Sequence, residues 1–387
     1  MGDASAAEAA SRRSGDPGMM KIKILLVCTG GIKNDGITSW AIQTYGAMDK
    51  TGLDLTAVAW EDSPEDAVER VESSGFTVVR LPNRKTHLRE YLHSFDELLQ
   101  RGFDVVHACG SSSLLGIELS LAKRAGAEMR IAHSRNTVCS HRVANSLLRP
   151  LLYNASTDFY ACGMDAGKWL FGKRGFTVIP NGKDPASFQF NYDKRQKMRK
   201  VLGINSGEIA IGHVGRVNEQ KNQLFLLDVF ESILRFRQGA RLFLIGDDGG
   251  LMKEVQNKVV EQGLLDRVSF LGRRDDVPDL LNAMDCMSLP SLYEGFPNVV
   301  LEWQYNGLPC VISNAVTDEC AVTSLVERVP LKKSPDDWAA AIIRKLADSD
   351  RANDSARATE ALRAAGYDVY ENAKTLKRLY TQGVTRI

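Results

Sequence analysis

The segment Pro290-Ser-Leu-Tyr-Glu-Gly-Phe-Pro-Asn-Val-Val-Leu-Glu302 organises the rest of this sequence. The apolar run Asp285-Cys-Met-Ser-Leu289 precedes it and predicts a buried strand that ends at Pro290. Pro297 then favours the start of a helix, because its fixed φ suits the first helical position and its missing N–H is not needed there. We therefore expect a strand, a turn and a helix in direct succession.

The turn and the helix carry two glutamates and a set of free backbone amides. The amides within Gly295–Asn298 are expected to point out of the helix N-terminus, where anions bind readily. Glu294 precedes the turn. If the helix starts near Pro297, Glu302 lies about one helical turn along it, roughly 6–8 Å along the axis from the amides. This arrangement suits a ligand with a phosphate in the middle and one carboxylate for each sugar. The alternative is a capping Glu294 and a solvated Glu302, and the segment alone favours neither.

Length and composition bound the class of protein. The 387 residues suit two domains of ordinary size, and the net charge of +1 argues against a general nucleic-acid binder. The seven cysteines are scattered and never form Cys-x-x-Cys, which favours buried thiols in the cytoplasm over disulfides or a zinc site. No apolar run approaches the ~20 residues that span a bilayer. Residues 1–18 lack an apolar core and are expected to be a disordered leader.

The first half of the chain alternates apolar strands with helical patterns. Ile22–Cys28 predicts a buried parallel strand that runs into a glycine turn, and a helix is expected from Thr38 to Met48. We expect one parallel-sheet domain over residues 19–185, with a turn or hinge at Asn181-Gly182 and a polar connector from Lys183 to Arg199. The further predicted strands are Leu55–Trp60, Thr77–Leu81, Val105–Ala108, Arg130–His133, Phe159–Ala161 and Thr177–Ile179.

A second domain of the same kind is expected over residues 186–365. We expect the final residues, 366–387, to form a helix that packs back toward the first domain. The sequence thus predicts an α/β fold of two Rossmann-like, doubly wound domains that face each other across a cleft. The predicted strands here are Ile209–Val214, Arg241–Ile245, Val268–Leu271, Asp285–Leu289, Pro309–Ser313 and Ser324–Val329. The predicted helices are Asn222–Phe236, Met252–Gly263, Val277–Met284 and the tail from Asp336 to Tyr380.

Two cations follow the first strand of the second domain. The run Gly215-Arg-Val-Asn-Glu-Gln-Lys-Asn222 places Arg216 and Lys221 at a strand C-terminus, where open α/β sheets bind ligands. Arg216 with its bidentate geometry and Lys221 as a point charge can hold a diphosphate. The alternative is two surface cations, but the position beside a predicted switch point favours function.

Taken together, these motifs resemble the retaining, nucleotide-sugar-dependent glycosyltransferases of the GT-B fold, in the fourth sequence family (group 1). Within it the sequence is most similar to bacterial exopolysaccharide and capsule transferases, from about Lys21 to Tyr380. The most specific motif is Glu294-x7-Glu302 within EGFPNVVLE. The motifs HVGRVNEQKN, LIGDDGG, FLGRRDDVPDLL and GLPCVIS support the resemblance in the family's order.

The resemblance implies a role for each motif. Glu294 would contact hydroxyls of the transferred sugar, and Glu302 would hold the nucleotide ribose. The glycine loop after the first strand, with Gly30 and Gly31, would close over the diphosphate. The segment around Leu271–Arg274 would form the wall of the site that contacts the nucleotide base. The residues implied as catalytic are Arg216, Lys221 and Glu294. The implied donor site comprises Gly30, Gly31, Arg216, Lys221, Arg273, Glu294, Gly295, Phe296, Pro297, Asn298 and Glu302.

The implied mechanism is retention at the anomeric carbon without a divalent metal or other cofactor. The amides and cations stabilise the charge that grows on the leaving diphosphate, whose phosphate can take the acceptor proton. Asp348-Ser-Asp350 lies in a polar helical tail and is expected to be solvated, so no metal is predicted. His133 is the candidate acceptor contact, with a structural histidine as the alternative. His107-Ala-Cys109 departs from the family's His-x-His, which puts an acceptor role for Cys109 in question.

A basic region suggests where the acceptor comes from. Between Leu121 and Lys183 there are ten Lys and Arg but three acidic residues, and Arg142–Tyr153 mixes arginines with leucines. Such a patch can rest on an anionic membrane or meet a lipid-pyrophosphate acceptor, whereas the alternative is an ordinary core-facing helix. We expect a cytoplasmic enzyme and hypothesise peripheral contact with the inner face of the membrane, although base rates slightly favour the core-facing helix.

The function that these observations favour is transfer of a hexose or N-acetylhexosamine, from a UDP-sugar, to a glycan or lipid-linked acceptor in polysaccharide synthesis. One alternative is a nucleotide-sugar epimerase of the same architecture, for which the sequence offers no convincing acid–base set. Another is a catalytically silent sugar-nucleotide-binding partner protein. The joint presence of both cations and both glutamates argues against a catalytically silent protein.

Overall fold

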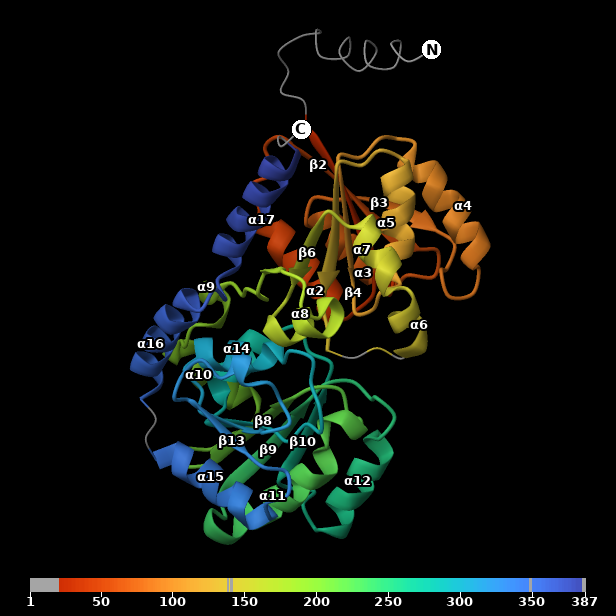
Figure 1. The fold of residues 1–387 in the computed structure, drawn as a ribbon. Helices are drawn as coiled ribbons and strands as arrows, with labels where there is room; N and C mark the ends of the chain where they lie inside the picture. The colour runs from red at the N-terminus through yellow and green to blue at the C-terminus, as the bar shows by residue number, and fades with distance from the viewer. Residues whose placement is uncertain (1–20, 138, 140–141, 348–349, 385–387) are drawn as a thin grey trace, which may run out of the picture.

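The structure is a computed structural model that describes residues 21–137, 139, 142–347 and 350–384 (Figure 1). It contains two α/β units, one above the other in the view of Figure 1. We call the seven-stranded sheet with its helices the first unit and the six-stranded sheet with its helices the second unit. The prediction of two doubly wound α/β units is confirmed. Residues 1–18, the predicted leader, lie outside the described residues.

The first unit is built on a parallel sheet in the order β3-β2-β1-β4-β5-β6-β7. Every strand predicted there forms within two residues of its expected ends. The strands are β1 (Ile22–Cys28), β2 (Leu53–Trp60), β3 (Thr77–Leu81), β4 (Val105–Gly110), β5 (Met129–Ser134), β6 (Asp158–Ala161) and β7 (Thr177–Val178). The helices are α2 (Gly36–Gly46), α3 (Glu65–Ser73), α4 (Leu88–Leu99), α5 (Leu115–Arg124), α6 (Arg142–Leu147), α7 (Arg149–Ala155) and α8 (Met164–Phe171).

The second unit repeats this plan in the order β10-β9-β8-β11-β12-β13, again with parallel pairing. Its strands are β8 (Ile209–Val214), β9 (Ala240–Ile245), β10 (Val268–Gly272), β11 (Cys286–Leu289), β12 (Cys310–Ser313) and β13 (Val326–Val329). Its helices are α11 (Gln223–Phe236), α12 (Met252–Glu261), α13 (Val277–Ala283), α14 (Asn298–Tyr305) and α15 (Pro335–Ala347), with short 3-10 turns η1 (Glu219–Lys221) and η2 (Asp318–Cys320).

Each sheet separates two hydrophobic cores. Along β1, Ile24 and Leu26 belong to one core while Leu25 and Val27 belong to the other, and all four are at most 2% exposed. A strand buried on both faces needs apolar residues without alternation, which is the pattern that made these strands predictable. The two cores of each unit hold the strand ends, and the loops that follow them, in fixed positions.

The segment from Lys183 to Arg199 was expected to be an irregular polar connector, and this prediction is wrong. The segment forms α9 (Pro185–Phe188) and most of α10 (Tyr192–Val201). The α10 helix packs against α13. It buries little apolar surface, since Met198 is its one buried residue among those described. Arg195 and Arg199 instead form ion pairs with Asp285, at 2.5 and 3.1 Å. Because ion pairs hold this helix in place, its sequence is polar and lacks the apolar pattern of a packed helix.

The tail forms α16 (Arg351–Ala364) and α17 (Val369–Val384) after α15. Figure 1 shows α17 running alongside the first unit, where it packs against α2 and β5. Lys377 pairs with Asp49 at 2.6 Å, and the Tyr380 hydroxyl lies 2.6 Å from His107 Nδ1. The predicted domain boundaries at 185 and 365 stay a prediction. Within the described part of the chain, no helix is both long and apolar enough to cross a bilayer.

Candidate active site

The candidate site lies where the order of the second sheet reverses. β8 and β11 are neighbours there, and their C-terminal loops meet because both strands run in the same direction. The Leu292 amide donates to the Gln220 carbonyl at 2.8 Å, and the Gln220 side-chain amide donates to the Tyr293 carbonyl at 3.0 Å. These bonds bring the loop of Arg216 and Lys221 against the loop of Glu294.

Glu294 and Lys221 form a nearly buried ion pair at the centre of the site. Lys221 Nζ lies 2.6 Å from Glu294 Oε1, and the two side chains are 17% and 8% exposed. The Ser291 hydroxyl also donates to Oε1, at 2.7 Å, and the Gln220 amide donates to Oε2, at 3.2 Å. Glu294 is therefore not a helix cap, and three groups from two loops fix its carboxylate.

Local backbone features set the position of Lys221. The Asn218 side chain accepts from the Lys221 amide at 3.0 Å, which closes η1. Asn222 then adopts the left-handed conformation at φ 58°, and it is the one such non-glycine residue in the described ranges. A Cβ on Gly215 would lie 2.9 Å from Lys221 Cε, so glycine there lets the lysine stem lie close to the backbone.

Arg216 differs from Lys221 in being free. It is exposed, and within the described residues its guanidinium has no hydrogen bond or ion pair. An arginine at a strand C-terminus with all five donors available can bind an anion in bidentate fashion.

The helix after Glu294 begins one residue later than expected. Pro297 is the N-cap of α14, not its first helical residue, because its ψ of 89° is not helical. No side chain caps the helix, and Asn298 Oδ1 has no partner within the described residues. The N-terminal amides of α14 are thus left for solvent or a ligand, while Phe296 packs on Tyr367 with ring centroids 5.6 Å apart.

Glu302 is not solvated. It pairs with Lys183, whose Nζ lies 2.6 Å from Glu302 Oε1, and the side chains are 5% (Lys183) and 13% (Glu302) exposed. Sequence reasoning missed Lys183, which was assigned to a polar connector. The one available signal was its place directly after the predicted hinge Asn181-Gly182.

The first unit reaches the same helix N-terminus. A Cβ on Gly295 would lie 2.4 Å from Asn136 Oδ1, and a Cβ on Gly36 would lie 3.9 Å from Asn298 Nδ2. In the predicted glycine loop, Gly31 has φ 75° and its Cβ would lie 2.8 Å from the Trp60 ring, so glycine is required there. A Cβ on Gly30 would meet only Lys33, the nearest atom being Nζ at 3.3 Å.

Arg273 is bonded across the two units. It lies 3.3 Å from Asp66 on α3, and both side chains are about half exposed, at 46% and 52%. The Asn34 side chain also donates to Asp66, and these bonds hold the pKa of that carboxyl below its usual value, with Asn34 the larger cause. The predicted contact between the Leu271–Arg274 wall and a nucleotide base stays a prediction.

His133 lies inside the first unit and not at its surface. It is fully buried, its Nδ1 lies 2.9 Å from His107 Nε2, and Arg135 donates to its Nε2 at 3.2 Å. Burial, and then the charge of Arg135, lowers the pKa of His107 to about 3 and that of His133 well below its usual value. Both rings are thus neutral. Direct contact of His133 with an acceptor stays a prediction, and this burial argues against it.

The same cluster is a poor metal site. In the described ranges, His107, Cys109 and His133 are the one group of His, Cys, Asp or Glu close enough to share an ion. The two rings already bond each other, and burial raises the pKa of Cys109 to about 12, so the thiol stays protonated. Arg135 adds a positive charge beside His133. Asp348 and Ser349 of the Asp-x-Asp sequence lie outside the described residues.

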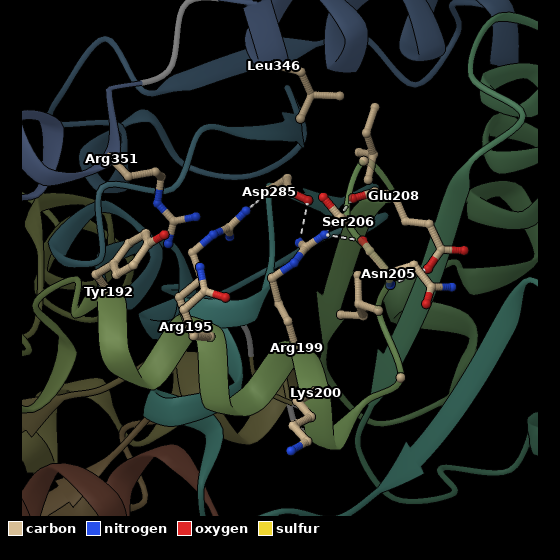
Figure 2. A pocket seen from close by; sticks show the side chains of 15 residues that line it. Tyr192, Arg195, Arg199, Lys200, Asn205, Ser206, Glu208, Asp285, Leu346 and Arg351 are labelled. Carbon is tan, nitrogen blue, oxygen red and sulfur yellow. Dashed lines mark hydrogen bonds and ion pairs between the residues drawn. The ribbon is translucent and has the colours of Figure 1, made fainter.

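A cavity of about 900 Å³ lies at the amino ends of β8 and β11, the opposite edge of the sheet from Glu294. Figure 2 shows the side chains that line it. Three arginines on its wall point toward Asp285 and the chain around it. Arg195 donates to the Asn282 and Met284 carbonyls, and Arg351 donates to the Met284 carbonyl at 2.6 Å. These guanidinium groups satisfy the carbonyls at the end of α13, so the cavity has a structural explanation.

A smaller cavity, of about 520 Å³, lies between the two units beside Glu294. The first unit contributes Thr137, Asp165 and Trp169 to its wall, and the second unit contributes the loop after β12 and Arg328. Glu294 is thus the candidate catalytic residue that lines this cavity, and Arg216 and Lys221 do not.

Comparisons with known proteins agree with this geometry. Residues 208–348 match the family model described as glycosyl transferases group 1. The putative glycosyltransferase EpsF of Bacillus subtilis is 30% identical over 375 residues, which cover 92% of this chain and 96% of that protein. A galactosyltransferase of Escherichia coli named UDP-Gal:alpha-D-GlcNAc-diphosphoundecaprenol alpha-1,3-galactosyltransferase is 36% identical over 148 residues, 38% of each chain.

Solved structures share the fold. The crystal structure of Anabaena Alr3699/HepE in complex with UDP matches with a TM-score of 0.77 and 19% identity, over 93% of this chain and all of that one. A structure of WaaG, described as a glycosyltransferase involved in lipopolysaccharide biosynthesis, matches with a TM-score of 0.66 and 17% identity, over 92% of this chain and 99% of that one. Two doubly wound units, the loops at their strand ends and a relative similar along nearly its whole length lead to one conclusion: this chain belongs to the group 1 glycosyltransferases and has their GT-B fold.

Proposed function

We propose that this enzyme moves a hexosyl or N-acetylhexosaminyl group from a UDP-sugar to a glycan or lipid-linked acceptor in cell-surface polysaccharide synthesis. Transfer would retain the anomeric configuration and need no metal or other cofactor. The observation that carries the proposal is the pair of Lys221 and Glu294, 2.6 Å apart, beside the uncapped N-terminus of α14. The residue proposed to recognise the sugar is thus adjacent to the groups proposed to bind the diphosphate.

The catalytic residues in this proposal are Arg216, Lys221 and Glu294. The Lys221 ammonium has three donors and Glu294 occupies one, so two remain for a diphosphate, which the free Arg216 guanidinium would also bind. Negative charge grows on the diphosphate as the sugar–phosphate bond breaks. Cations already in place, with the α14 amides, stabilise that state more than the ground state. The leaving phosphate would then take the acceptor proton on the same face.

Glu302 is the proposed ribose contact. Lys183 bonds its Oε1, and within the described residues Oε2 has no hydrogen bond, so Oε2 is available to accept from a sugar hydroxyl. The remaining donor contacts would come from the α14 N-terminus, from Gly30 and Gly31, and from Arg273.

The names of similar proteins support the choice of donor and acceptor. The HepE structures are complexes with UDP and with UDP-glucose, and the E. coli relative is named for UDP-Gal and a diphosphoundecaprenol-linked sugar. A relative from Staphylococcus aureus, 25% identical over 293 residues, is named a capsular polysaccharide biosynthesis glycosyltransferase.

We also propose that the enzyme works in the cytoplasm, with the first unit against an anionic membrane. All seven cysteines are free thiols, as a reducing compartment favours. On α6, Val143 and Leu147 are 75% and 74% exposed, and their spacing of four residues puts them on one helical face. Co-sedimentation with vesicles rich in phosphatidylglycerol should fall in Val143→Ser/Leu147→Ser, and no binding by the native chain at low salt would contradict this part.

The test of donor class is thermal unfolding against nucleotides and nucleotide sugars, with EDTA present. A ligand at a hundredfold excess over its dissociation constant adds about 2.7 kcal/mol of stability. We expect a shift with UDP and UDP-sugars that Arg216→Ala abolishes, and NMR of the product should show the donor's anomeric configuration. No shift with any nucleotide would contradict the transferase, a shift without any transfer would favour a silent partner protein, and sugar epimerisation without acceptor would favour an epimerase.

A further inference from the structure

The cavity of about 520 Å³ beside Glu294 has walls from both units, and its size falls within the range of roughly 300–1,000 Å³ typical of small-molecule sites. Arg216, Lys221 and Glu302 do not line it. Glu294 and Gly295, which are proposed donor contacts, do line it, so the cavity adjoins the proposed site of the transferred sugar. A ligand in the cavity would therefore lie beside the transferred sugar.

Directed hydrogen bonds between the two units hold the cavity in shape. The Glu319 carboxylate accepts from the backbone amides of Met164 at 2.9 Å and Asp165 at 3.0 Å, the first residues of α8. A Cβ on Gly163 would lie 2.5 Å from Glu319 Oε2, so glycine permits this approach. The Thr317 hydroxyl donates to Asp165 Oδ2 at 3.2 Å. A carboxylate at a helix N-terminus is favourable, which makes this a stable contact between the units.

The cavity wall includes one fixed aromatic ring. Trp169 is partly exposed, and its Nε1 donates to the Ser111 carbonyl at 3.1 Å, which prevents the ring from turning away. The face of an indole packs well on apolar surface such as the C–H groups of a pyranose, and its large area dominates the contact.

The charge around the cavity is negative. Arg328 is the one cation among the wall residues, and its guanidinium also donates to the Asn314 and Val316 carbonyls. Lys221 stands directly behind Glu294. Arg149 also lies directly behind the wall, where it donates to the Trp169 carbonyl at 3.4 Å. The carboxylates on or directly behind the wall outnumber these three cations by one and are Asp165, Glu294, Asp318 and Glu319. Carboxylates accept hydrogen bonds from sugar hydroxyls and repel an anionic ligand.

We infer that this cavity binds an uncharged pyranose unit of the acceptor, with Trp169 as its stacking surface and Asp165 as a hydroxyl acceptor, and that it disfavours acidic sugars. The inference rests on the proposed function and adds to it the class of acceptor. Trp169 and Asp165 act here as specificity-determining residues, since in the described part of the chain neither has a hydrogen bond or ion pair with a residue proposed for the donor.

The test uses two probes that differ in one group: methyl β-glucoside and methyl β-glucuronide, with UDP present to fill the donor site. Their affinities are measured by titration in saturation-transfer NMR. We expect the glucoside to bind at least about tenfold more tightly to the native enzyme, the ratio expected from like-charge repulsion at short range. Asp165→Asn/Asp318→Asn should bring the two affinities within about threefold of each other.

Matched variants separate stacking from folding. Trp169→Ala should weaken glucoside binding about tenfold, whereas Trp169→Phe keeps a ring and should change it less than about threefold. Asp266→Asn is the charge control, because Asp266 is exposed between α12 and β10 and has no partner within the described residues. UDP affinity should stay unchanged in all of these variants, which shows that they are folded.

Each other result overturns the inference in a distinguishable way. The inference is contradicted if the glucuronide binds as tightly as the glucoside or more tightly, if the glucoside does not bind, or if the double asparagine variant leaves the ratio unchanged. In each of these cases, binding of UDP would still support the proposed function. If Asp165→Asn weakens UDP-glucose but not UDP, the cavity belongs to the donor sugar instead. If the native enzyme binds no UDP, the proposed function itself fails.

Discussion

The ammonium nitrogen of Lys183 lies 2.6 Å from Oε1 of Glu302, and the two side chains are 5% and 13% exposed. This contact joins the segment after the hinge to α14. The backbone of Lys183 also bonds Tyr367 and Val369, at 2.8 and 3.1 Å, where the chain turns toward α17. One lysine thus ties the proposed ribose carboxylate to the place where the chain returns to the first unit.

Removal of Lys183 should destabilise the enzyme. Lys183→Met leaves Glu302 largely buried without its counter-charge, which costs about 3–5 kcal/mol for a buried pair. Lys183→Met/Glu302→Gln should recover part of that loss. Urea unfolding measures both, with Lys374→Met as the control, since Lys374 is 73% exposed and solvent screens its pair with Glu371. A loss under 1 kcal/mol in Lys183→Met would contradict the role of this pair.

Arg216→Ala should separate function from stability. Arg216 is exposed and its guanidinium has no partner within the described residues, so the free energy of unfolding should change by less than about 0.5 kcal/mol. Transfer should fall by about 100- to 1,000-fold, the usual loss when a group that stabilises transition-state charge is removed. Thermal unfolding without ligand and initial rates with donor measure the two effects. A stability loss as large as the loss in transition-state stabilisation would show a structural role instead.

Gly295→Ala should push the two units apart. The added Cβ would lie 2.4 Å from Asn136 Oδ1, a distance at which one side must shift. We expect weaker UDP binding, because the shift moves the α14 N-terminus. Asn136→Ala removes the obstructing atom, so the double variant Gly295→Ala/Asn136→Ala should bind UDP more tightly than Gly295→Ala alone. A double-mutant cycle on UDP affinity tests this, and additive effects would mean that the two residues do not meet.

The buried histidines should make stability fall in mild acid. Burial lowers the pKa of His107 to about 3 and that of His213 to about 4, while an unfolded histidine has pKa 6.5. Below pH 6.5 the unfolded chain binds protons that the folded chain does not, so stability rises with pH between the folded and the unfolded pKa. Each such histidine contributes a slope of about 1.4 kcal/mol per pH unit in that window.

Substitutions identify the groups responsible for this slope. His107→Gln should flatten the dependence of the free energy of unfolding on pH between 6.5 and 4.5, even if its stability at pH 7.5 is lower. His93→Gln is the control, because the His93 side chain is 78% exposed. Urea titrations at several pH values measure the slopes, and identical slopes in both variants would exclude His107 as a source.

Local sequence was sufficient for the strands and for the loops that follow them. Ile22–Cys28 and Ile209–Val214 form where continuous apolar runs predicted them, because a strand covered on both faces needs no alternation. Arg216, Lys221 and Glu294 follow strand ends directly. Their meeting at one edge of a parallel sheet then followed from topology.

Side-chain partners could not be read from the sequence. Lys183 was assigned to a connector, Glu302 had a solvated alternative, and His133 was placed at the acceptor, yet the structure pairs the first two and buries the third. Whether a charge is buried depends on a partner that can be more than a hundred residues away, and on chain crossings such as that of α17. Apolar periodicity is a local property and specified the layers of this protein, whereas its ion pairs, its buried histidines and the cavity between its units depend on tertiary packing.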